Sequence, residues 1–196
     1  MIRKVEMERL SVISARPFDE VVAAIKASIG NPNMAEFVRS TQRAESAADL
    51  EAAIQPVLGR AGLMLFVEFD QGMILRKGTE RHTSKIIRLV IENPLIMKEM
   101  AKHVPDAGSY APVTVLVDER ADGVHLSYDR MASLLAPYGN SEVLNVARDL
   151  DAKVEDLLGK RQLDGRKEGY EPSFEVGCLC QFSNPCRHQR IAAWRN

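Results

Sequence analysis

Four potential metal ligands are clustered near the end of the 196-residue chain. Cys178, Cys180, Cys186 and His188 form the pattern Cys-x-Cys-x5-Cys-x-His. Thiolates and imidazole are ligands that zinc prefers, and four of them so close in sequence could surround one ion. Structural zinc sites usually begin with two to four residues between the first cysteines, and a one-residue gap would strain both thiolates toward the same ion. The alternative is three reduced thiols in a loose segment, so the sequence assigns no metal site here.

Two histidines are candidates for proton transfer or ligand contact. His125 alternates with Val124 and Leu126, which places it on the opposite face of a regular strand. A solvent-facing histidine explains this position better than a ligand contact does. His103 stands near the end of a short predicted helix, where the negative end of the helix dipole favours it. Neither has a nucleophile in a recognised motif beside it, so a hydrolase triad has no support.

Tyrosines and one asparagine complete the candidate ligand-binding residues. Tyr110, Tyr128 and Tyr138 could place their phenols at the rim of a cavity between sheet and helices, although half-buried tyrosines are common in any core. Asn93, followed by Pro94, is typical of a helix start, and such an N-terminus holds an anion where it opens into a pocket. We therefore take Asn93, Tyr110, His125 and Tyr128 as the predicted ligand-binding residues and assign no catalytic residue and no metal ligand.

The first half of the chain contains two helical patterns and a hairpin signal. A strand with a register break is predicted over residues 5 to 13, and a helix over residues 18 to 29. A second helix begins after Ser46 and should kink or stop early at Pro56. The apolar stretches 63 to 70 and 73 to 76 flank Asp70-Gln71-Gly72, which indicates a β-hairpin.

The second half predicts three strands and two helices. The strands cover residues 85 to 91, 113 to 118 and 124 to 128, the last two joined at Asp122-Gly123. A short helix starts at Pro94, and the longest helix covers residues 141 to 158. Strands in the middle with helices near both ends favour an α+β fold, with helices on an antiparallel sheet.

The last 37 residues differ from the rest. Residues 160–196 contain seven basic and four acidic side chains and show no sustained helical or strand period. We expect one domain over residues 1–159 and a poorly ordered tail over residues 160–196.

Composition narrows the function classes. The net charge of −1 gives no positive field for nucleic acid or an anionic membrane, so neither is expected as a partner. The apolar runs are too short to span a bilayer, and the first residues do not form a secretory signal. A cytoplasmic protein is the default expectation. No glycine-rich phosphate-binding loop occurs, and no motif in the sequence indicates a particular cofactor.

Several segments resemble a known family. These are residues 91–97 with the Asn-Pro pair, residues 105–115, residues 126–129 and the closing helix over 146–158. Together with the opening strand and helix, the chain resembles the domain-of-unknown-function family DUF302 over about residues 5–158. The resemblance implies a small α+β domain with helices on one face of an antiparallel sheet, similar to the TATA-binding-protein-like fold. Since the family usually passes from its first helix almost directly into the second strand, the resemblance also implies an insertion at about residues 31–61, or a divergent subgroup. The family has no established activity, so the resemblance implies no reaction.

Three functional hypotheses follow. The first is a non-catalytic module that binds a small apolar or amphipathic ligand between sheet and helices, with a homodimer as a further expectation. The second is an enzyme that uses His103, His125 or a tyrosine as general acid or base. The third is a protein–protein interaction module that uses the segment at about residues 46–58 or the tail.

Overall fold

The chain is described here by a computed structural model covering residues 4–78 and 84–163. Within these residues, five antiparallel strands form one sheet in the order β1-β5-β4-β3-β2. The strands are β1 (Arg9–Ser14), β2 (Met64–Asp70), β3 (Ile86–Glu92), β4 (Val113–Arg120) and β5 (Gly123–Asp129). β1 and β2 are therefore the two edge strands.

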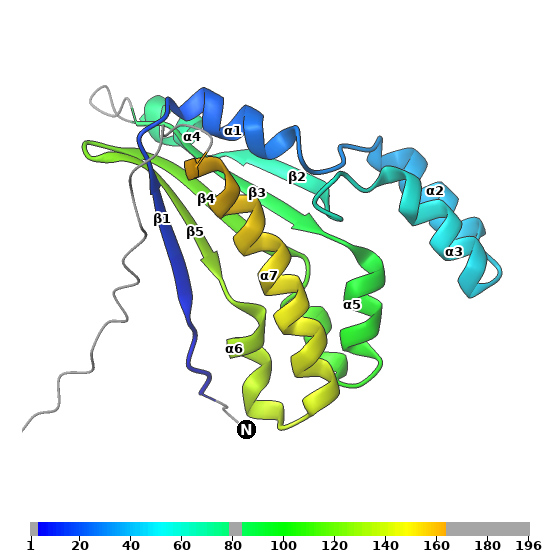
Figure 1. The fold of residues 1–196 in the computed structure, drawn as a ribbon. Helices are drawn as coiled ribbons and strands as arrows, with labels where there is room; N and C mark the ends of the chain where they lie inside the picture. Colours follow the sequence, from blue (N-terminus) through cyan, green and yellow to red (C-terminus); the bar gives the residue numbers. More distant parts are fainter. Residues whose placement is uncertain (1–3, 79–83, 164–196) are drawn as a thin grey trace, which may run out of the picture.

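Helices cover one face of this sheet, as Figure 1 shows for α1, α5 and α7. The helices are α1 (Phe18–Lys26), α2 (Met34–Arg43), α3 (Ala47–Ile54), α4 (Gln71–Gly78), α5 (Pro94–Ala101), α6 (Met131–Leu135) and α7 (Ser141–Leu163). Short 3-10 turns lie at Gln55–Val57, Pro105–Ser109 and Ala136–Tyr138. The predicted α+β class, with an antiparallel sheet covered on one face, is confirmed.

The main core lies between the sheet and these helices. Alternate residues of the strands point into it, and α1 and α7 contribute apolar residues at helical spacing. Its fully buried members include Ile25 on α1, Leu89 on β3, and Ala147, Leu150 and Val154 on α7. Because the buried residues of α7 recur every three to four positions, one face of this helix packs on the sheet along several turns.

The second face of the sheet is turned away from α1, α5 and α7. On β5, Val124, Leu126 and Tyr128 point into the core, whereas His125 and Ser127 point to the second face. The predicted orientation of His125 is therefore confirmed. Its side chain is only 12% exposed, however, so the expectation of a solvent-facing histidine is wrong. A contact with Asp122 at the β4–β5 turn accounts for part of this burial.

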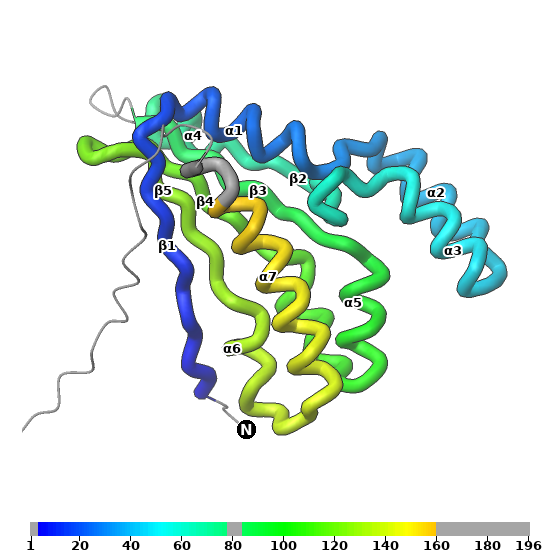
Figure 2. Tube along the Cα trace, in the orientation of Figure 1, coloured from blue at the N-terminus to red at the C-terminus, as the bar shows by residue number. Residues whose placement is uncertain are grey.

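A helical hairpin extends from one end of the molecule. α2 and α3 lie side by side beyond the start of β2, away from β1 (Figure 2). They share a second, smaller core, whose buried members are Phe37, Ile54 and Met64. The sequence pattern predicted α3 and its early end at Pro56 correctly, but it missed α2.

The predicted hairpin at Asp70-Gln71-Gly72 is wrong. Residues 73 to 76 belong to α4, and β2 pairs with β3 instead. The physical reason is that Oδ1 of Asp70 accepts a hydrogen bond from the backbone N–H of Met73 at 2.7 Å, which satisfies a free donor of the first helical turn. An aspartate before a glycine fits a turn as well as a helix start, so the sequence signal was ambiguous.

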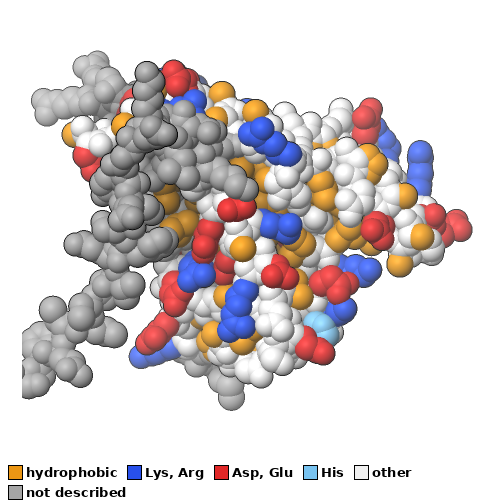
Figure 3. Space-filling view, in the orientation of Figure 1, with side chains coloured by type: hydrophobic (Ala, Val, Ile, Leu, Met, Phe, Trp, Pro, Cys, Tyr) orange, Lys and Arg blue, Asp and Glu red, His pale blue; other side chains and the backbone are white. Residues whose placement is uncertain are grey.

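The remaining strand and helix predictions agree with the structure to within a few residues, and Gly123 adopts a φ of 140° in the β4–β5 turn. In the described part of the chain, no helix is long and apolar enough to cross a membrane. On the helix-covered side, acidic and basic side chains are interspersed (Figure 3). α7 continues through Leu163, past the boundary predicted at residue 159. The rest of the predicted tail, from residue 164 onward, lies outside the described residues.

Candidate functional site

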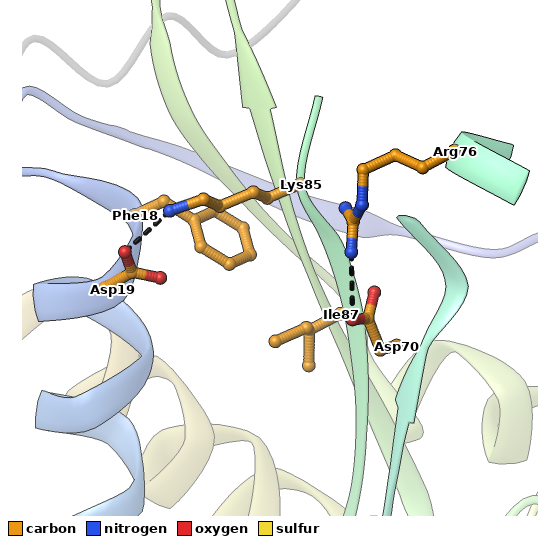
Figure 4. A pocket seen from close by; sticks show the side chains of 6 residues that line it. All are labelled: Phe18, Asp19, Asp70, Arg76, Lys85 and Ile87. Atoms are coloured by element: carbon orange, nitrogen blue, oxygen red, sulfur yellow. Dashed lines mark hydrogen bonds and ion pairs between the residues drawn. The ribbon is translucent and has the colours of Figure 1, made fainter. Parts of the chain in front are cut away.

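A cavity of about 290 Å³ opens beside the start of α1. It is lined by Phe18, Asp19, Asp70, Arg76, Lys85 and Ile87. These residues come from α1, the end of β2, α4, the start of β3 and the residue just before β3, so distant parts of the sequence meet there (Figure 4). Two apolar side chains and four charged ones therefore surround one space.

One side of the cavity holds an ion pair over an aromatic ring. Nζ of Lys85 lies 2.6 Å from Oδ2 of Asp19 and 5.6 Å from the centre of the Phe18 ring (Figure 4). Asp19 is in the first turn of α1, where the helix dipole favours a carboxylate. Its side chain is 79% exposed, so solvent screens this pair and a competing anion can reach Lys85.

The other side holds a second ion pair. Nη2 of Arg76 donates to Oδ2 of Asp70 at 3.1 Å, while Oδ1 of Asp70 caps α4. Gly72 leaves room for this arrangement, because a Cβ there would lie 2.7 Å from Nη1 of Arg76. Asp70 is thus held by two contacts, whereas the carboxylate of Asp19 is held by its contact with Lys85.

Asn93 performs the helix-start role predicted for it. Its Oδ1 accepts the backbone N–H of Leu95 at 3.0 Å, and its Nδ2 donates to the carbonyl of Gly62 at 3.0 Å. The side chain therefore ties the start of α5 to the loop before β2.

Replacing Asn93 by alanine is expected to lower the free energy of unfolding by about 1 to 2 kcal/mol, because a helix cap and a hydrogen bond between two segments are both lost. Urea denaturation of the wild type and Asn93→Ala measures this. Asn145→Ala, on the surface of α7, is the control. An equal effect of both substitutions would contradict the role of Asn93.

The phenol of Tyr110 lies at one end of a hydrogen-bonded chain of three polar side chains. Its hydroxyl lies 3.3 Å from the hydroxyl of Tyr138, which donates to Oδ2 of Asp106 at 2.8 Å. These hydrogen bonds, first that with Tyr110 and then that with Asp106, raise the pKa of Tyr138 to about 12. The Tyr138 phenol is therefore protonated at neutral pH.

Each of the two candidate histidines lies against a carboxylate. Nε2 of His125 lies 2.8 Å from Oδ1 of Asp122, and Nδ1 of His103 lies 2.9 Å from Oε2 of Glu142. The hydrogen bond with His125 is the largest cause that lowers the pKa of Asp122. Neither histidine is among the residues that line the cavity.

Tyr128 is buried in the main core. Its hydroxyl donates to Oδ1 of Asp151 on α7 at 2.6 Å, and burial is the main reason that its pKa is raised. The four predicted ligand-binding residues thus have separate surroundings: a helix start, a pair of phenols, the second face of the sheet and the core. Ligand binding by any of them stays a prediction.

A buried acidic residue was missed by the sequence analysis. Glu92, at the end of β3, is 4% exposed, and its Oε1 has no hydrogen-bond partner among the described residues. Burial raises the pKa of Glu92 to about 7. The sequence signal was its position at the end of an apolar strand, next to Asn93.

The cavity residues were also missed as a group. Lys85 and Asp19 are 66 positions apart, so no motif links them. Within the described residues, no group of three or more histidine, cysteine, aspartate or glutamate side chains could hold a metal ion. Cys178, Cys180, Cys186 and His188 lie outside those residues.

The architecture defines an α+β protein with helices on one face of its sheet, and comparisons place it in a family. The family model described as "Domain of unknown function DUF302" matches residues 38–160, so the chain belongs to this family, as its resemblance implied. The fold is similar to that of an uncharacterized conserved DUF302 protein from Bacillus stearothermophilus, with a TM-score of 0.55 and 11% identity. That match covers 76% of this chain and 94% of the other. No curated protein matches the chain.

Proposed function

We propose that the protein is a binding module for a small amphipathic ligand with one anionic group, held in the cavity beside α1. The observation that supports this most is the placement of Lys85 and Arg76 around a space that the apolar side chains of Phe18 and Ile87 also line. Its volume of about 290 Å³ lies near the lower end of the range typical of ligand sites. A ligand of this size carries a short apolar chain or one ring.

The two halves of such a ligand have complementary surfaces in the cavity. The ring of Phe18 and the side chain of Ile87 contact the apolar part, while Lys85 and Arg76 bind the anion. The anion displaces Asp19 from Lys85, since that carboxylate is largely exposed. Asp70 stays in place because it also caps α4.

Calorimetric titration with octanoate, and with octanol as the neutral counterpart, tests this proposal. Octanoate is expected to bind more tightly than octanol, and Lys85→Met and Arg76→Met each weaken octanoate binding about tenfold, which corresponds to roughly 1.4 kcal/mol. Lys102→Met removes a surface ion pair with Glu99 on α5 and should change nothing.

Asp19→Asn gives the sharpest outcome. Removing the competing carboxylate should strengthen octanoate binding several-fold, whereas a purely structural ion pair would give no gain. The proposal is overturned if octanoate does not bind, or if Lys85→Met and Asp19→Asn leave its affinity unchanged.

A further inference from the structure

Exposed apolar side chains are concentrated in the edge strand β2 and in the helix that follows it. Among the described residues, eight large apolar side chains are exposed, and five of these fall between positions 67 and 75. The five are Val67, Phe69, Met73, Ile74 and Leu75. They belong to β2 and to α4, which follows it directly. Clusters of exposed apolar side chains are common where one protein contacts another.

The backbone of this edge is open over part of its length. Gly30 bridges the start of β2, where the N–H of Leu65 donates to the carbonyl of Gly30 at 2.8 Å. Beyond that point, no described strand pairs with the outer side of residues 66–70. The irregularity of β2 lies between Leu65 and Val67, and residues 67–70 beyond it contain no proline or lysine of the kind that often blocks an edge strand.

We infer that β2 pairs with β2 of a second copy of this chain across a two-fold axis at Glu68. Antiparallel pairing about this point places Val67 of each copy opposite Phe69 of the other, on the second face of the sheet. Aromatic and β-branched side chains make favourable cross-strand pairs. A two-fold contact of one surface with itself is also the commonest form of dimer.

The charges on the helix-covered face of β2 fit the same arrangement. The two Glu68 side chains would meet at the axis, but each lies 2.7 Å from Nζ of Lys26 in its own copy. Each carboxylate is therefore already paired with an ammonium group of its own copy, which weakens the repulsion between the two carboxylates. This pairing goes beyond the proposed ligand binding and does not depend on it.

Light scattering and sedimentation of the full chain at increasing concentration test the pairing. The wild type is expected at twice the chain mass of 21.8 kDa. Val67→Lys and Phe69→Glu each raise the dimer dissociation constant at least tenfold. Ile13→Lys is the matched control, because Ile13 on the opposite edge strand is 46% exposed, as Phe69 is.

A double variant tests the proposed register, in which Val67 of one copy lies opposite Phe69 of the other. In the double variant Val67→Lys/Phe69→Glu, the introduced cation and anion face each other twice across the axis, so the dimer is restored in part. Hydrogen exchange should also be slower at residues 66–70 in the dimer than in either single variant. The inference is overturned if the wild type stays monomeric, even if hydrogen exchange at residues 66–70 is slow, because that protection would then arise within one chain. It is also overturned if Val67→Lys leaves the dimer intact.

Discussion

Replacing Asp151 by alanine is expected to lower the free energy of unfolding by about 3 to 5 kcal/mol. Asp151 is 1% exposed and accepts three hydrogen bonds: from the Tyr128 hydroxyl at 2.6 Å, the Met131 N–H at 2.7 Å and the Ala132 N–H at 3.1 Å. The substitution leaves all three buried or half-buried donors without this acceptor. Asp151 thereby joins α7 to the start of α6 and to β5.

Urea denaturation measures this effect. Asp149→Ala, two positions earlier on the exposed side of α7, should change the stability by no more than about 0.5 kcal/mol. Tyr128→Phe removes one of the donors and should cost about 1 kcal/mol. If Asp151→Ala costs no more than Asp149→Ala, the hydrogen bonds of Asp151 do not stabilise the fold.

Glu92 is expected to make the protein less stable as the pH rises through neutrality. Its folded-state pKa of about 7 lies above the ordinary value of 4.5, so the folded state binds the proton more tightly than the unfolded state does. The stabilisation by the bound proton is complete below pH 4.5 and is lost as the pH rises past about 7. The difference between the pKa of Glu92 in the folded state and its ordinary value corresponds to about 3 kcal/mol in the free energy of unfolding.

Glu92→Gln isolates this contribution. We expect the stability of the variant relative to the wild type to rise between about pH 5 and pH 8, because glutamine does not ionise. Glu51→Gln, at an exposed position on α3, should show no such trend. A constant difference between wild type and Glu92→Gln over this range would show that Glu92 does not titrate as its burial predicts.

Local patterns predicted most of the fold because the relevant signals are short. Asn93-Pro94 marks the start of α5, Asp122-Gly123 marks the β4–β5 turn, and the apolar spacing of α7 marks its buried face. The pattern failed at Asp70, where the same residue types allow a turn or a helix cap. It also missed α2, which has a single buried residue, Phe37.

The candidate site could not be predicted in the same way. Asn93, Tyr110, His125 and Tyr128 were selected as residue types that could bind a ligand, but each lies in different surroundings. The cavity instead brings together Asp19 and Lys85, and Asp70 and Arg76. Only the first contact crosses a large distance in sequence, and no local spacing indicates it.

The sequence by itself determined the α+β class, most of the strands and helices, and the family, because these depend on periodicity and on short motifs. Tertiary structure decided which charged side chains surround the cavity, which carboxyl groups are buried, and which strand forms the apolar edge. Burial and ion pairing depend on the packing of segments distant in sequence, such as α1 and the segment that leads into β3. For that reason, the pKa of Glu92 and the pairing of Lys85 follow from the fold and from no motif.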